Sequence, residues 1–171
     1  MKTRTSHGSG RVAPGELGAL GEGSVIEETA LVFHPARVFL GAGVYVAHYA
    51  VLQGYHSGEL RIGDGSWVGP HCLLHGAGGL FVGRDVGIGP GVRILTSVHQ
   101  DPGGIQPVME GALAFAPVVI GDGCDLGCNA VVLPGVTLGR GVQVGAGAVV
   151  TRDLPDGAVA IGAPARVTRQ R

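Results

Sequence analysis

The sequence predicts an all-β protein, a parallel β-helix built from hexapeptide repeats. In the C-terminal half of the chain an aliphatic residue recurs at every sixth position, at Ile120, Leu126, Val132, Leu138, Val144 and Val150. A strand alternates with a period of two and a helix with a period of 3.6, so neither element alone explains a strict period of six. Short strands joined by tight turns do explain it, with three strands in each turn of a coil.

The residue after each aliphatic position indicates the length of one coil. Glycine follows the first and second position of a set, as at Gly121 and Gly127, whereas Leu133 or Thr151 follows the third. The true repeat is therefore eighteen residues, one full three-sided coil.

The same register continues upstream. Three further sets show the six-residue spacing: Leu40, Val46, Leu52; Ile62, Val68, Leu74; and Val82, Ile88, Ile94. Residues 40–152 are therefore expected to form about five regular coils. Residues 25–39 are expected to form an irregular capping coil, because Val38 and Leu40 break the spacing and the end of a solenoid is usually atypical.

Extra residues enter the repeat at one corner only. The gaps that follow the third positions Leu52, Leu74 and Ile94 are longer than six, which predicts short excursions at 53–61 and 75–81 and a long loop at 96–117. Loops carried on a rigid scaffold are common places for functional residues. This corner is therefore the first place to expect chemistry.

The remaining boundaries follow from composition. Residues 1–24 are rich in Gly and Ser and are expected to be a flexible lead-in, residues 25–155 form the β-helix, and residues 156–171 form a basic C-terminal tail. A hydrophobic fraction of 45% with only 15% charged residues indicates a filled core despite 33 glycines.

Charge and hydropathy exclude several classes of partner. The formal net charge of -1 gives no reason to expect nucleic acid or an anionic membrane. No apolar run approaches the roughly 20 residues of a membrane span, and no signal-peptide pattern is present, so a cytoplasmic protein is expected. Cys72 and Cys124 each precede an aliphatic position by two and should point into the core.

Four segments carry a family resemblance: IGDGSWVGP (62–70), VGRDVGIGPGVRILTSVH (82–99), PVVIGDGCDLGCNAVVLPGVTLG (117–139) and VGAGAVVTRDLPDGAVAIGAPARV (144–167). Through them the chain resembles the bacterial hexapeptide-repeat acyltransferases, which include galactoside and maltose O-acetyltransferases and nucleotide-sugar N-acetyltransferases. The resemblance implies a left-handed coil and a homotrimer with active sites between subunits. It also implies transfer of an acetyl group from acetyl-CoA to a hydroxyl or amino group of a sugar or nucleotide-sugar.

The resemblance assigns two catalytic groups. It places the general base at His99, sixteen residues past Gly83, where an imidazole with a pKa near neutrality can take a proton from the attacking group. It gives the backbone N–H of Cys128 as the donor to the oxyanion. Asp125 stands where many relatives have tryptophan, so the acyl or acceptor pocket is expected to differ here.

His75 is a third candidate catalytic residue. It follows the third aliphatic position one coil before His99, so stacking should bring it near the base of the long loop. There it could contact the acceptor or assist proton transfer, or simply bond to the backbone of the turn. His56, His71 and Trp67 are candidate acceptor contacts. Galactoside-acting relatives carry asparagines near this place, which argues against a galactoside acceptor.

The C-terminal coils resemble a CoA site. Gly145 and Ala146 allow close approach of a pantetheine arm to the backbone. The resemblance assigns contacts with pantetheine, adenine or phosphates to Thr151, Arg152, Arg166 and Arg169. Arginine suits phosphate because its guanidinium donates two parallel hydrogen bonds.

Two alternatives stay open. The segments VAHYAVLQG (46–54) and VGPHCLLHG (68–76) resemble γ-type carbonic anhydrase repeats, in which three histidines hold a metal. His48 and His75 fit that pattern, but Gln53 and Pro70 replace the other expected histidines, so no metal site is expected. A non-catalytic trimeric scaffold would explain the repeats but not the loop that carries His99.

Overall fold

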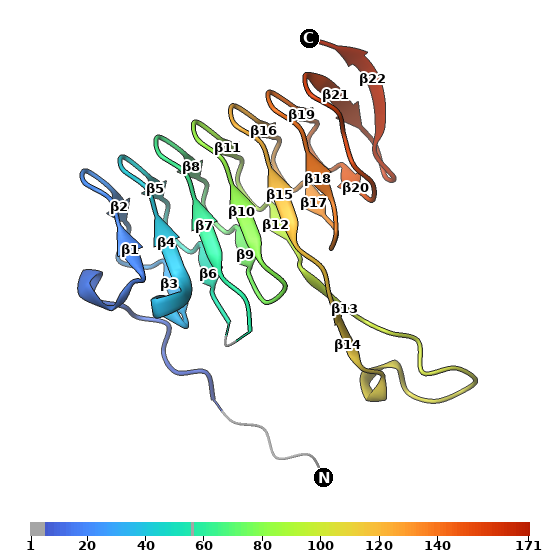
Figure 1. The fold of residues 1–171 in the computed structure, drawn as a ribbon, viewed down its shortest axis with the longest axis horizontal. Helices are drawn as coiled ribbons and strands as arrows, with labels where there is room; N and C mark the ends of the chain where they lie inside the picture. The colour runs from blue at the N-terminus through green and yellow to red at the C-terminus, as the bar shows by residue number, and fades with distance from the viewer. Residues whose placement is uncertain (1–5, 56) are drawn as a thin grey trace.

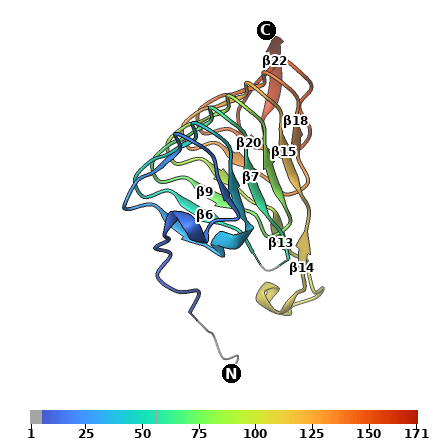
Figure 2. The same ribbon diagram turned by 60° about the vertical axis from the view of Figure 1, so that its left-hand side comes forward.

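A computed structural model describes residues 6–55 and 57–171, and it is a left-handed parallel β-helix (Figures 1 and 2). The fold class predicted from the repeats is confirmed. His56, a candidate acceptor contact, lies outside the described residues.

Three parallel sheets form the sides of the coil. Sheet A contains β1 (Ala19–Leu20), β4 (Val38–Leu40), β7 (Leu60–Ile62), β10 (Leu80–Val82), β15 (Val118–Ile120) and β18 (Thr137–Leu138). Sheet B contains β2 (Val25–Ile26), β5 (Tyr45–Val46), β8 (Trp67–Val68), β11 (Gly87–Ile88), β16 (Asp125–Leu126), β19 (Gln143–Val144), β21 (Ala158–Ile161) and β22 (Arg166–Gln170). Sheet C contains β3 (Leu31–Phe33), β6 (Val51–Gln53), β9 (Leu73–His75), β12 (Arg93–Ile94), β17 (Val131–Val132) and β20 (Val149–Val150).

Each coil takes one strand from each sheet in chain order. We number them coil 1 (β1–β3), coil 2 (β4–β6), coil 3 (β7–β9), coil 4 (β10–β12), coil 5 (β15–β17) and coil 6 (β18–β20). The turn from sheet B to sheet C is called the B–C corner. The connection from sheet C to sheet A of the next coil is called the C–A corner.

The six-residue spacing builds the core, because it places one aliphatic residue on the inner face of every strand of coils 1 to 6. The aliphatic residue of each strand points inward, and Leu52, Leu74 and Leu126 have no exposed surface. The outward residue beside it reaches solvent, because successive side chains of a strand point to opposite faces. Cys72 and Cys124 are buried as predicted.

The first coil begins earlier than the sequence analysis placed it. Leu20 pairs with Leu40, and Val32 pairs with Leu52, so Leu20, Ile26 and Val32 form its aliphatic set. Val38 lies on β4 together with Leu40, two residues apart on the same inward face. The apparent break in spacing is therefore the entry into coil 2, and the lead-in ends before residue 19 rather than at 24.

The C-terminal residues also continue the coil. β21 pairs in parallel with β19, and β22 folds back antiparallel on β21. Ala158 and Ala160 are fully buried, so part of the segment expected as a basic tail closes the core at this end.

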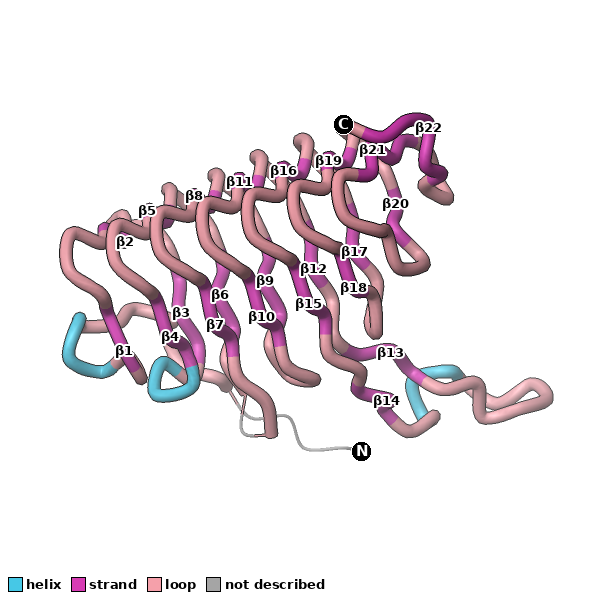
Figure 3. The backbone as a smooth tube through the Cα atoms, turned by 45° about the horizontal axis from the view of Figure 1, so that its top comes forward, coloured by secondary structure: helices cyan, strands magenta, loops and turns pink. Residues whose placement is uncertain are grey.

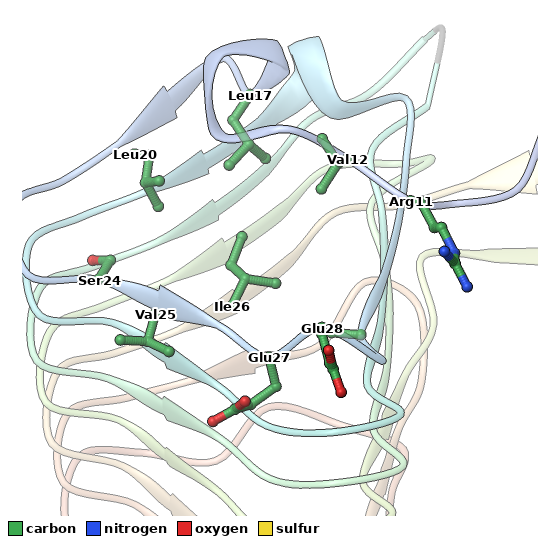
Figure 4. A pocket seen from close by; sticks show the side chains of 10 residues that line it. Arg11, Val12, Leu17, Leu20, Ser24, Val25, Ile26, Glu27 and Glu28 are labelled. Atoms are coloured by element: carbon green, nitrogen blue, oxygen red, sulfur yellow. The ribbon is translucent and has the colours of Figure 1, made fainter.

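The other end of the core is open. A pocket of about 530 Å³ lies against coil 1, with Leu17, Leu20 and Ile26 on its apolar wall and Glu27 and Glu28 nearby (Figure 4). Its lining residues belong to the first coil and the segment before it, whereas the predicted catalytic residues lie on coils 3, 4 and 5.

All three insertions leave the coil at the C–A corner, as predicted. The longest forms a two-stranded antiparallel hairpin, β13 (Ser97–His99) with β14 (Leu113–Phe115), that projects away from the coil (Figures 1 and 3). The helices are single turns: η1 (Pro14–Glu16), η2 (Pro35–Arg37) and η3 (Val108–Glu110). Within the described residues no helix is long and apolar enough to cross a membrane.

Candidate active site

His99 lies on β13, at the start of the projecting hairpin. Its Nδ1 atom is 3.2 Å from the backbone oxygen of Gly111 across the hairpin. A carbonyl oxygen only accepts, so Nδ1 must carry the proton in this contact. In the neutral ring this leaves the Nε2 lone pair to accept a proton, which is what a general base requires.

His75 lies at the base of this hairpin, as its place in the repeat predicts. Its Nδ1 atom is 3.2 Å from Oγ1 of Thr96, the residue that precedes β13. The Thr96 hydroxyl donates to the backbone oxygen of His75 at 2.8 Å and accepts from the backbone N–H of Gly78 at 2.9 Å. Thr96 is fully buried, so these bonds tie coils 3 and 4 together beneath the hairpin.

Burial lowers the pKa of His75 below its ordinary value, because desolvation disfavours the charged ring. Near neutral pH the ring is therefore held in its neutral form. A neutral imidazole beside the hairpin can exchange hydrogen bonds with an acceptor without adding charge to the site.

A pocket of about 410 Å³ lies between the insertions at the C–A corner and the hairpin. Its lining residues are Tyr55, Ser57, Ala77, Gly78, Leu113 and Phe115. His99 stands directly opposite Leu113 in the antiparallel ladder, so their side chains share one face of the hairpin. Leu113 and Phe115 were not predicted at this place, because nothing in the repeat predicts how the two arms of the loop pair.

Cys128 lies at the B–C corner of coil 5, and its side chain is exposed. Its backbone N–H has no backbone or side-chain acceptor within residues 6–55 and 57–171. Pro70 and Pro90, which have no N–H to satisfy, occupy the equivalent place in coils 3 and 4. The free amide is therefore a property of this turn, available to an oxyanion at Cys128.

The remaining candidate acceptor contacts also lie on sheet B and the B–C corner. Trp67, Gly87 and Asp125 are successive partners in sheet B. His71 stacks on Tyr49 with ring centroids 5.1 Å apart and planes 9° from parallel. Tyr49 was not among the predicted contacts, although the repeat places it one coil below His71.

The residues assigned to CoA divide between two corners. Gly145 and Ala146 lie at the B–C corner of coil 6. Arg166 lies near them, because the N–H of the preceding Ala165 donates to the backbone oxygen of Val149. The C–A corner of coil 6 carries Thr151 and Arg152, both exposed. Arg169, on β22, pairs with Val159 beside sheet B.

The histidines of the metalloprotein alternative also lie at different corners. His48, at the B–C corner, has Nδ1 2.8 Å from Oγ1 of Thr29 and Nε2 3.5 Å from Glu27. His75 lies at the C–A corner. No group of three His, Cys, Asp or Glu side chains in the described part of the chain could hold a metal ion.

Known proteins share this repeat. Residues 117–152 match the family model described as the hexapeptide repeat of succinyl-transferase. A galactoside O-acetyltransferase from Lactococcus lactis is 35% identical over 114 residues, which are 66% of this chain and 53% of that protein. A tetrahydropyridine-dicarboxylate N-acetyltransferase from Staphylococcus aureus is 41% identical over 88 residues, 52% of this chain and 32% of that protein. Thus the chain spans about half or less of the length of these curated relatives.

Solved structures share the fold. An N-acyltransferase from Bacillus cereus, in complex with dTDP and 3-hydroxybutyryl-CoA, has a TM-score of 0.81 at 22% identity, over 91% of this chain and 84% of that one. A hexapeptide-repeat acetyltransferase from Vibrio cholerae, in complex with acetyl-CoA, has a TM-score of 0.68 at 22% identity, over 91% and 72%. The solved structures show that the chain shares their fold, and the repeat match with the curated relatives shows that it contains hexapeptide repeats and resembles the acyltransferases that carry them.

Proposed function

We propose that the protein is an acyl-CoA-dependent transferase that moves an acetyl group from acetyl-CoA to a hydroxyl or amino group of a sugar or nucleotide-sugar. The observation that carries the proposal is the bond between His99 Nδ1 and the Gly111 carbonyl, which leaves Nε2 of a projecting histidine as the proton acceptor. The sequence relatives that transfer acetyl groups, and the fold relatives in complex with CoA or acetyl-CoA, support it.

The transfer proceeds without a covalent enzyme intermediate. The acceptor oxygen or nitrogen attacks the thioester carbon while His99 Nε2 removes its proton. The carbonyl oxygen then becomes an oxyanion, which the Cys128 amide stabilises. Collapse of this intermediate re-forms the carbonyl, breaks the C–S bond and releases CoA as the thiolate, which takes up a proton.

The proposed site needs a second copy of the chain. His99, Thr151 and Arg152 lie at the C–A corner, whereas Cys128, Gly145 and Ala146 lie at the B–C corner. The catalytic pair and the CoA contacts are thus divided between the same two corners. A cyclic trimer that brings the C–A corner of one subunit to the B–C corner of the next would complete three equivalent sites.

CoA would lie along coils 5 and 6. The Gly145–Ala146 turn would pair with the pantetheine amides, and Arg152, Arg166 and Arg169 would meet the phosphates or adenine. These arginines make no ion pair with any described carboxylate, so N–H donors of their guanidinium groups are available to a ligand.

Calorimetric titration with acetyl-CoA, with CoA as the companion titrant, tests the proposal. We expect saturable binding near one molecule per chain, and thiol release when sugars are added. Absence of binding by a correctly folded protein would overturn the proposal.

A further inference from the structure

The outward face of sheet B has one position without a side chain. Seven residues form the row that faces outward along this sheet: Val25, Tyr45, Trp67, Gly87, Asp125, Gln143 and Val159. Gly87, on coil 4, interrupts this row, and the other members have large or polar side chains. Glycine inside a strand is unfavourable, so its presence there usually has a local reason.

Close packing between the coils does not explain the glycine at position 87. A Cβ placed on Gly87 would meet only Oδ1 of Asp125, at 3.1 Å, which is the end of an exposed side chain. By contrast, a Cβ on the neighbouring Gly89 would lie 2.6 Å from the backbone oxygen of Leu126. Gly89 is therefore required by the close approach of coils 4 and 5, whereas Gly87 is not.

The space over Gly87 has an aromatic neighbour on one side. Trp67 lies on the same sheet one coil earlier, 40% exposed, and its indole lies close to Gly69 rather than over Gly87. The stacked pair of His71 and Tyr49 extends this aromatic surface around the B–C corner. Flat aromatic surfaces of this kind suit the C–H face of a sugar ring.

The neighbour on the other side is acidic. Asp125, on coil 5, forms no ion pair with a described Lys, Arg or His side chain. Adjacent strands lie about 4.8 Å apart, so the backbones of Trp67 and Asp125 are separated by roughly 10 Å, and the Asp125 carboxylate reaches over Gly87 into the gap between them. Cys128, the proposed oxyanion donor, is three residues beyond Asp125.

We propose that the position over Gly87 binds the acceptor, and that the acceptor is an amino sugar whose ring packs on Trp67 and whose amino group is held by Asp125. This inference rests on the proposed acyltransferase function and selects nitrogen over oxygen as the nucleophile. Transfer forms the amide N–C bond and breaks the thioester C–S bond. The ammonium loses two protons, one through His99 to solvent and one to the departing CoA thiolate.

The sole tryptophan of the chain is Trp67, so intrinsic fluorescence reports on this position. The probes are glucosamine, galactosamine and mannosamine, with glucose, galactose and mannose as matched hydroxyl controls. We expect a saturable change with at least one amino sugar and a weaker response to its hydroxyl counterpart. Gly87→Val, which fills the space, and Asp125→Asn, which removes the charge, should each weaken binding at least about tenfold.

The control variant Thr137→Val places a valine at an exposed strand position on sheet A and should bind like the wild type. Calorimetry with CoA, on every variant, separates the two proposals. CoA binding without a response to any of the amino sugars would overturn this inference and leave the acyltransferase standing. Unweakened amino-sugar binding by Gly87→Val would also overturn it, whereas loss of CoA binding by the wild type would count against the proposed function itself.

Discussion

His99 and Cys128 stand on adjacent coils of one chain but at different corners. His99 follows β12 at the C–A corner of coil 4, and Cys128 follows β16 at the B–C corner of coil 5. The strands of sheet C, β12 in coil 4 and β17 in coil 5, run between the two corners. In the proposed site, therefore, the base and the oxyanion donor that act on one thioester would come from different copies of the chain.

The amide of Cys128 can be removed without changing its neighbours. Because Pro70 and Pro90 occupy the equivalent turn position, Cys128→Pro should fold normally and bind CoA like the wild type. Loss of the N–H should lower kcat about 10²- to 10³-fold. Cys128→Ala, which keeps the N–H, is the control. Full turnover by the proline variant in a thiol-release assay would exclude this amide as the oxyanion donor.

Replacing His99 removes the proposed base. His99→Ala should retain CoA binding and lose about 10²- to 10⁴-fold in turnover, with Gln100→Ala as the neighbouring control. When His99→Ala and Cys128→Pro are mixed and their subunits exchange at random, about a quarter of the sites in a trimer should combine an intact His99 with an intact Cys128 amide and regain activity. If the mixture stays as inactive as its components, the two groups do not meet between subunits.

His75 should make stability depend on pH. Burial lowers its folded pKa, so the folded state binds this proton less readily than the unfolded state. The stabilising contribution is complete above the unfolded pKa of about 6.5 and is lost as the pH falls from there through the lower folded pKa. Urea unfolding between about pH 7.5 and 5 should show a smaller loss for His75→Gln than for the wild type. Equal losses in both proteins would show that other groups dominate.

The three cysteines should differ in reactivity. Burial raises the pKa of Cys72 to about 11 and also raises that of Cys124, whereas Cys128 is exposed. A disulfide reagent near neutral pH should therefore label one thiol per chain rapidly, because the thiolate is the reactive form. The fast phase should disappear in Cys128→Ala, and CoA should slow it in the wild type. Rapid labelling of all three would contradict the buried positions.

The inward aliphatic ladder should dominate stability. Leu74 has no exposed surface, so Leu74→Ala should lower the free energy of unfolding by about 2–5 kcal/mol. Val119→Ala is the matched control, because Val119 lies on a strand of the same coil stack but is 38% exposed. Denaturant unfolding at one protein concentration measures both. A similar small change in both variants would argue against a tightly packed core.

The period of six made most of the coil predictable, because it constrains the inward residue of every strand and places every insertion. The start of coil 1 escaped prediction, since Leu20 lies in a Gly-rich segment and the two-residue step from Val38 to Leu40 breaks the six-residue spacing. Strands β21 and β22 escaped because the six-residue spacing ends near residue 150.

The site could be predicted only in part. His75 and Thr96 meet because their coils stack, and the repeat predicted that His75 would lie there. The Gly111 carbonyl, which orients His99, carries no sequence signal, because any residue has a backbone oxygen. The pairing of His99 with Leu113 depends on the register of the hairpin arms, which the repeat does not set.

The reversal of direction at β22 has a consequence for polymer growth. A stack of parallel rungs exposes hydrogen-bonding edges at both ends, and such edges can recruit further chains. At the C-terminal end β22 runs against β21 and interrupts the pattern that a new rung would copy. Coil 1 has no such reversed strand among the described residues. A truncated or partly unfolded form should therefore add further chains at the coil 1 end first.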